Sequence, residues 1–126
     1  LELNKLDLIK ISSHTYTHRS LHKMNDNQIK HELESSKIFL ENLLKTDINS
    51  VCYPKGEFNM LTIDIAAAIG YRNQYSSIPS FFTNRVVKNV IGRSLVQFAE
   101  KNEFKAILKG GDHILAFWYK TKHFKL

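Results

Sequence analysis

Hydrophobic residues along this chain follow two different spacings. Short apolar runs bounded by polar residues, glycine or proline are typical of buried strands. They occupy residues 8–12, 50–53, 71–76 and 91–96. Spacings of three and four residues place apolar side chains on one helical face, and they run from Asp26 over about five turns, then over residues 60–69 and 97–108. The sequence therefore predicts strands and helices that alternate along the chain.

Two asparagines mark where helices are expected to begin. Asn25 has Gln28 three residues later, the spacing of a capping box, and Asn59 precedes the second helix. Gly70 stands where that helix is expected to end. The apolar face of the first helix is predicted to consist of Ile29, Leu33, Ser36, Leu40, Leu43 and Leu44.

The two ends of the chain leave alternatives open. Residues 1–7 fit either the tail of a helix or the approach to a strand, and residues 113–126 fit either a strand or a docking helix. No internal repeat or low-complexity segment interrupts the pattern. At 126 residues the chain has the size of a single domain, 1–126.

Alternating strands and helices favour an α/β fold with a parallel sheet, because each parallel strand needs a crossover connection. Functional side chains of such sheets gather at the carboxyl ends of the strands. His14 follows the first predicted strand, and Pro54-Lys55-Gly56 follows the second. We therefore expect these two loops to lie side by side on one rim of the sheet.

Charge and cysteine content exclude some functions. The formal charge is +6, but the 18 Lys and Arg residues are scattered and mixed with Glu, so we expect a solvated surface and no nucleic-acid partner. The single cysteine, Cys52, excludes an intrachain disulfide and lies in an apolar run, which favours a small buried side chain. The sequence contains no run of 18 consecutive apolar residues, so no transmembrane span is predicted.

His14 and His18 are four residues apart in a polar loop. Imidazole nitrogens are good ligands for zinc and neighbouring transition metals, and this spacing brings two rings within reach of one ion. The alternative is chance, because the chain has six histidines and most surface histidines bind nothing. The spacing alone does not identify a third ligand.

Three segments carry a more specific pattern. Residues 13–21 read Ser-His-Thr-Tyr-Thr-His-Arg-Ser-Leu, residues 51–56 read Val-Cys-Tyr-Pro-Lys-Gly, and residues 91–96 read Ile-Gly-Arg-Ser-Leu-Val ahead of a helix-like stretch. In this order they resemble the His-Ser/Thr-x-x-x-His metal motif, the next motif, and the closing strand and helix of polysaccharide deacetylases of carbohydrate esterase family 4. The resemblance runs over residues 8–108.

The resemblance implies a partial (β/α) barrel, that is, an incomplete distorted TIM-like barrel, and hydrolysis of N-acetyl groups from an N-acetylglucosamine-containing polysaccharide. It implies a divalent metal, zinc, with His14 and His18 as ligands. The backbone N–H of Lys55 would face the oxyanion, and Tyr53 and Pro54 would shape the acetyl pocket. An extracellular, periplasmic or cell-envelope location follows from the same resemblance.

Arg93 is a further candidate. It lies in a predicted strand that ends near the rim, where its side chain could orient a catalytic carboxylate. An ordinary surface salt bridge is the alternative for this residue.

This chain also lacks or changes several motifs of the family. No Asp-Asp segment, which would supply the third ligand and the general base, precedes His14, and Asp7 lies ahead of the predicted strand. The late Leu-x-His motif is absent, and Lys55 replaces an aromatic residue. A closed barrel of this general kind takes about 200 to 250 residues. We therefore expect the C-terminal portion of a catalytic domain, which by itself binds metal weakly and has no turnover.

A different function class stays open beside the enzyme. A non-catalytic carbohydrate-binding or assembly module derived from such an enzyme would use aromatic rings for stacking on sugars, and the candidates are Tyr53, Phe81, Phe82 and Trp118. Unpaired strands at the edge of a half-barrel also predict self-association.

Overall fold

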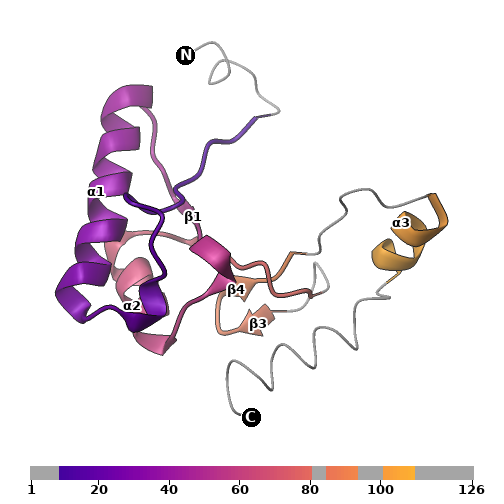
Figure 1. Ribbon diagram of the computed structural model, residues 1–126. Coiled ribbons are helices and arrows are strands. Elements are labelled where there is room, and N and C mark those ends of the chain that lie inside the picture. Colours follow the sequence, from indigo (N-terminus) through magenta and orange to yellow (C-terminus); the bar gives the residue numbers. More distant parts are fainter. Residues whose placement is uncertain (1–8, 81–84, 94–100, 110–126) are drawn as a thin grey trace.

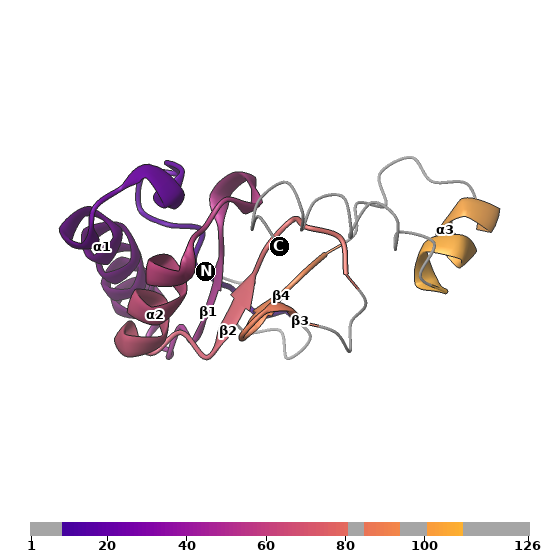
Figure 2. The same ribbon diagram turned by 90° about the horizontal axis from the view of Figure 1, so that it is seen from below.

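A four-stranded sheet with two helices packed on one face organises the chain (Figures 1 and 2). The computed structural model describes residues 9–80, 85–93 and 101–109. The strands are β1 (Ser50–Cys52), β2 (Asn73–Tyr75), β3 (Arg85–Val87) and β4 (Val90–Ile91), in the order β1-β2-β4-β3. The helices are α1 (Asp26–Leu44), α2 (Met60–Ile69) and α3 (Lys101–Leu108), with 3-10 turns η2 (Leu21–Lys23) and η3 (Pro54–Gly56).

The parallel part of the sheet is the predicted one. β1 pairs with β2 in parallel, and α2 makes the crossover between them, as parallel strands require. β2 also pairs with β4 in parallel, so the predicted strands at 50–53 and 71–76 are confirmed.

The last predicted strand is wrong in its position. Residues 91–96 were expected to form one strand. In the structure the strand β4 ends at Ile91, and it pairs with β3 in an antiparallel hairpin joined at Lys88 and Asn89. Lys88 has a φ of 44°, a left-handed conformation that closes the tight loop. The sequence did not reveal this turn because Lys88 and Asn89 include neither glycine nor proline. Residues 94–96 lie outside the described residues.

The predicted strand at 8–12 is also wrong. Within residues 9–13, only Ser13 makes a bridge, pairing in parallel with Val51. The Ser13 N–H donates to the Ser50 carbonyl, and the Cys52 N–H donates to the Ser13 carbonyl, both at 2.9 Å. An apolar run forms a strand only where successive residues find ladder partners, and here the pairing with β1 is confined to one residue.

α1 begins as the sequence predicts. Asn25 and Gln28 form a reciprocal capping box, and the helix ends at Lys45, whose φ of 54° is left-handed. The buried face includes Ile29, Leu33 and Leu44, but Leu43 is 53% exposed. At about 100° per residue, position 43 points in nearly the same direction as the buried Glu32 and Ser36, so its exposure follows from its place in the last turn of α1 and not from the side of the helix on which it lies.

α2 matches its prediction from cap to cap. Asn59 and Thr62 form the second capping box, and Gly70 ends the helix with a φ of 103°. The two helices pack against each other and against the sheet (Figure 2). The fully buried side chains of this core include Leu21, Ile29, Leu33, Ile48, Val51, Tyr53, Ile63, Tyr71 and Val90.

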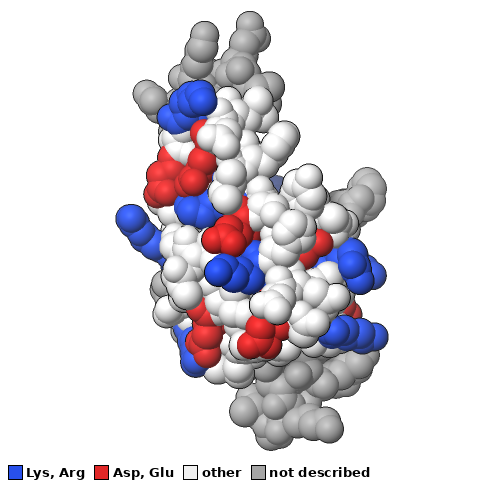
Figure 3. Space-filling view, turned by 90° about the vertical axis from the view of Figure 1, so that its left-hand side faces the viewer, with Lys and Arg blue, Asp and Glu red and all other residues white. Residues whose placement is uncertain are grey.

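The outer face of the two helices has a mixed charge. Lys and Arg side chains alternate with Asp and Glu over the face shown in Figure 3, without a basic stripe. None of the helices in the described part of the chain combines the length and apolar character needed to cross a membrane. Several predictions concern residues outside the described ranges: the segments 1–7, 97–100 and 113–126, with Asp7, Phe81, Phe82 and Trp118.

Candidate metal centre

Residues 13–20, which include His14 and His18 and are called the histidine loop below, lie beside the η3 turn at the carboxyl end of β1, as the sequence predicts. The bridge between Ser13 and Val51 holds the start of the loop against β1. His14 then reaches the end of that strand, where its Nδ1 lies 2.7 Å from the Cys52 carbonyl oxygen. Tyr53 and η3 follow directly along the chain.

The rings of His14 and His18 converge. Their centroids are 4.8 Å apart and their planes cross at 67°, and both residues are exposed. With metal–nitrogen bonds of about 2.0 to 2.1 Å, two imidazoles at this separation can reach a common ion. The separation of the two rings therefore allows both histidines to bind one ion.

The hydrogen bond to Cys52 fixes the tautomer of His14. A backbone carbonyl can only accept, so the proton of the neutral ring sits on Nδ1 and the lone pair sits on Nε2. Histidine ligands of metal ions commonly donate their second ring N–H to a carbonyl or carboxylate in this way. In His14 this leaves Nε2 as the ring nitrogen with a free lone pair.

The loop between the two histidines is locally strained. Thr15 has a φ of 67° and His18 a φ of 60°, left-handed values that are unusual for residues with a side chain. Such conformations cost about 1–3 kcal/mol each and persist only where the surroundings impose them. Local bonds contribute: the His18 N–H donates to Thr15 Oγ1 at 3.1 Å, and the Thr15 N–H donates to Ser13 Oγ at 3.3 Å.

Glu32 of α1 supplies the tertiary anchor for this loop. Its Oε2 accepts the backbone N–H groups of Tyr16 at 3.0 Å and of Thr17 at 2.8 Å, and its Oε1 accepts the Thr17 hydroxyl. One turn further along, the hydroxyls of Ser36 and Ser13 are 2.8 Å apart. α1 therefore holds the histidine loop at two points.

The carboxylate of Glu32 is ionised despite its burial. Only 4% of the residue is exposed, and burial alone would raise its pKa. The hydrogen bonds from Thr17 and Tyr16, together with the positive charge of Arg19, outweigh burial and hold the pKa of Glu32 below its ordinary value. The sequence carried one signal for this residue, a carboxylate inside the apolar stripe of Ile29 and Leu33, and our sequence reading did not use it.

Tyr53 is part of the core. The residue is 1% exposed, its ring stacks on Phe58 with centroids 5.1 Å apart, and its hydroxyl donates to Gln74 Oε1 at 2.5 Å. Burial raises the pKa of Tyr53 well above its ordinary value. Its ring is therefore not available for stacking on a sugar in this structure.

The η3 turn presents a backbone donor. Lys55 has a φ of 56° and is exposed, whereas Pro54 and Gly56 are buried. The N–H groups of Gly56 and Glu57 donate to the Tyr53 and Pro54 carbonyls, while no described residue accepts a hydrogen bond from the Lys55 N–H. A Cβ added to Gly56 would lie 2.2 Å from Ser77 Oγ, so the turn requires glycine there.

Arg93 lies across the ends of β1 and β2. Its Nη2 is 2.6 Å from Cys52 Sγ and its Nε donates to the Ser76 carbonyl at 3.3 Å. Burial raises the pKa of the Cys52 thiol, and the Arg93 charge opposes that shift. Among the described residues, Arg93 makes no ion pair with a carboxylate.

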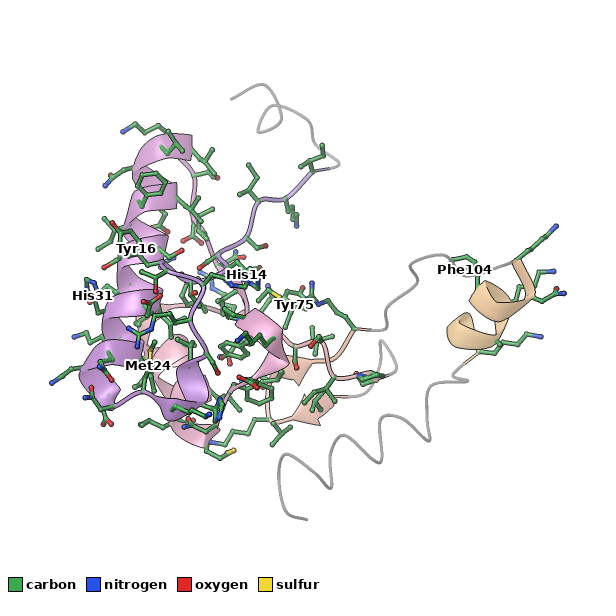
Figure 4. The ribbon with its side chains drawn as sticks, viewed as in Figure 1. His14, Tyr16, Met24, His31, Tyr75 and Phe104 are labelled. Carbon is green, nitrogen blue, oxygen red and sulfur yellow. The ribbon has the colours of Figure 1, made fainter. Side chains whose placement is uncertain are left out.

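A hollow of about 520 Å³ opens beside His14. It lies between the histidine loop and α1, and Tyr16, which faces α1 in Figure 4, forms part of its wall. Its lining residues are Ser12, His14, Thr15, Tyr16, Ser36, Phe39 and Leu40.

The described residues fit part of a metal site. Two imidazole nitrogens suit zinc and related divalent ions. Among the described residues, however, no group of three or more His, Cys, Asp or Glu side chains gathers at one point. A complete site of three ligands therefore needs at least one ligand from outside the described ranges.

The family model described as polysaccharide deacetylase matches residues 2–74, which is more than half of the chain. This segment includes both histidines, Glu32, and β1 with the η3 turn. No curated protein sequence gives a significant match.

Three solved structures share the fold. A de-N-acetylase from Aggregatibacter actinomycetemcomitans has a TM-score of 0.71 and 19% identity, over 85% of this chain and 50% of that one. Streptococcus pyogenes deacetylase PplD, solved in complex with acetate, has a TM-score of 0.65 and 20% identity, over 77% of this chain and 43% of that one. The BpsB deacetylase domain from Bordetella bronchiseptica has a TM-score of 0.61 and 20% identity, over 70% of this chain and 44% of that one.

These likenesses confirm the predicted fold class. The sheet and its helices form part of a distorted (β/α) barrel of the type found in those structures. This chain spans half or less of the length of each of them.

Proposed function

This chain belongs to the polysaccharide deacetylase family, and from that premise we propose that residues 1–126 form one domain unit that supplies two metal ligands and a substrate-facing turn to a hydrolase. The reaction is removal of N-acetyl groups from an N-acetylglucosamine-containing polysaccharide. The observation that supports this proposal most strongly is the convergence of the His14 and His18 rings, 4.8 Å apart, beside the η3 turn.

His14 and His18 hold a divalent metal, which we propose to be zinc. When bound, the metal polarises the amide carbonyl and lowers the pKa of a bound water toward neutrality. His14 uses Nε2, because its Nδ1 proton is committed to the Cys52 carbonyl. The third ligand and the general base come from outside the described residues.

The η3 turn acts on the substrate. The Lys55 N–H, which has no acceptor among the described residues, donates to the oxyanion that develops on the acetyl carbonyl. Pro54 shapes the acetyl pocket, and Tyr53 supports the turn from the core through its bond to Gln74. Arg93, anchored on Cys52 and Ser76, orients a catalytic carboxylate that the rest of the barrel supplies.

The setting of the reaction follows from the substrate class. A polysaccharide of this kind places the protein outside the cell, in a periplasm or at the cell envelope. The exposed edge of the partial barrel also favours association with a second copy of this chain.

Zinc titration calorimetry on the 126-residue chain tests the metal site. We expect binding weaker than that of a complete three-ligand site, its loss in His14→Ala and in His18→Ala, and no release of acetate from a chitooligosaccharide by this chain alone. The control is His31→Phe, since His31 is an exposed histidine on α1 and a phenyl ring keeps the ring contact with Tyr16, where the centroids are 6.0 Å apart. No binding by the native chain, or equal loss in the His31 variant, would remove the site.

A further inference from the structure

Among the described residues, Glu32 is the carboxylate that binds the backbone between His14 and His18 from a different element. It lies in the middle of α1, 14 residues after His18, and is 4% exposed. Both of its oxygens are used, Oε2 by the Tyr16 and Thr17 N–H groups and Oε1 by the Thr17 hydroxyl. Tyr16 and Thr17 are two of the three residues that separate the histidines.

The direction of the loop backbone depends on these bonds. For both N–H groups to point at one oxygen, the backbone at residues 16 and 17 must curl around the carboxylate. On either side of that curl, Thr15 and His18 have the left-handed φ values of 67° and 60°. Glu32 is the only described residue that accepts hydrogen bonds from the N–H groups of Tyr16 and Thr17, so both groups would lose their acceptor without it.

The rigid partner is the helix. Glu32 is flanked on the buried face of α1 by Ile29, Leu33 and Ser36, and Ser36 makes the second contact to the loop at Ser13. α1 is itself fixed by its capping box and by the bond from the Tyr71 hydroxyl to the Leu33 carbonyl at 2.9 Å. The loop therefore takes its position from α1 through Ser36 at its start and through Glu32 between the two histidines.

We propose that Glu32 is a positioning residue for the metal centre: its carboxylate, by binding the backbone between the two histidines, sets the separation and the crossing angle of their rings. This inference rests on the proposed metal site. Glu32 does not touch either ring, so it acts through the backbone of Tyr16 and Thr17.

Two substitutions distinguish the effect of the hydrogen bonds that Glu32 accepts from the effect of its negative charge. Glu32→Gln removes the charge but keeps the reach, because its amide oxygen can accept both N–H groups and its NH2 can donate to Thr17 Oγ1. Glu32→Asp keeps the charge but is shorter by one methylene, so it cannot serve both N–H groups and the hydroxyl from the same helix. The matched control is Glu34→Asp on the same helix, where no bond to the loop exists.

The experiment is zinc titration calorimetry on the native chain and these three variants, with thermal unfolding of each sample. We expect Glu32→Asp to bind zinc about 10- to 100-fold more weakly, the range for losing a supporting partner of a metal ligand. We expect Glu32→Gln and Glu34→Asp to stay within about threefold of the native dissociation constant, and all four proteins to unfold cooperatively.

Each contrary outcome has a distinct meaning. If the native chain binds no zinc through His14 and His18, the proposed function fails and the inference fails with it. If the native chain binds zinc and folded Glu32→Asp binds equally well, only the positioning role is overturned. If Glu32→Gln loses as much affinity as Glu32→Asp, the effect comes from charge and positioning is again overturned. If Glu32→Asp does not fold, native-like zinc affinity in Glu32→Gln supports positioning and a tenfold loss overturns it.

Discussion

Tyr53 stands directly before the η3 turn, and its ring is enclosed by the core. Its hydroxyl donates to Gln74, which is itself 0% exposed and donates through Nε2 to the Ile63 carbonyl at 3.1 Å. This chain of bonds links the end of β1 to β2 and α2. The residue therefore contributes to the candidate site by fixing the backbone that presents Lys55.

Tyr53→Phe should lower the free energy of unfolding by about 1–3 kcal/mol, because it leaves the buried Gln74 Oε1 without its donor. The measurement is urea denaturation followed by circular dichroism. Tyr75→Phe is the matched control, since Tyr75 is partly exposed and no described residue receives a hydrogen bond from its hydroxyl. Equal stability of the Tyr53 variant and the native chain would contradict the bond from Tyr53 to Gln74.

Both well-formed helices begin with an asparagine capping box, but the two caps have different surroundings. Among the described residues, the Asn25 side chain bonds only to the Gln28 backbone. Asn59 accepts from the Thr62 N–H and hydroxyl, and its Nδ2 also donates to the His22 carbonyl at 3.2 Å. The second cap thus joins α2 to η2, which follows the histidine loop in the chain.

We expect Asn25→Ala to cost about 1 kcal/mol of unfolding free energy, and Asn59→Ala to cost about 1 kcal/mol more because it also removes a tertiary bond. Chemical denaturation of the two variants side by side gives the comparison. Asn27→Ala, at an exposed position inside α1, is the control and should stay within about 0.5 kcal/mol of native. Equal losses for the two caps would show that the bond to His22 contributes nothing.

At the scale of the whole molecule, the partial barrel leaves apolar side chains exposed beside the histidine loop. Tyr16 and Phe39 line the hollow next to His14 and are 56% and 58% exposed, and Ile9 nearby in sequence is 40% exposed. The neighbouring segment 9–13 pairs with β1 only at Ser13, and no other described residue forms a backbone hydrogen bond with residues 9–12. An apolar patch beside unpaired backbone groups favours association.

The native chain should therefore self-associate as its concentration rises, as measured by multi-angle light scattering, and Phe39→Lys should shift it toward the monomer. Ile38→Lys is a matched control, because Ile38 is 53% exposed but lines the groove between α1 and α2. A native chain that stays monomeric at high concentration would contradict the prediction, as would an equal effect of the two lysines.

The sequence by itself determined the features that depend on near neighbours. The caps at Asn25 and Asn59, the end of α2 at Gly70, the turn at η3 and the polar loop with His14 and His18 all involve groups within a few residues of each other. The alternation of strand and helix then placed the two loops on one rim, because crossover connections leave little choice.

Only the tertiary structure decided which distant groups meet. Glu32 reaches Thr17 across 15 residues, Tyr53 reaches Gln74 across 21, and Arg93 reaches Cys52 across 41. A hydrophobic pattern says that a position is buried, but the partner of a buried polar group depends on how helix and sheet pack. That is why the sequence showed the histidine pair and a carboxylate inside the apolar stripe of α1, but not that this carboxylate binds the loop between the histidines.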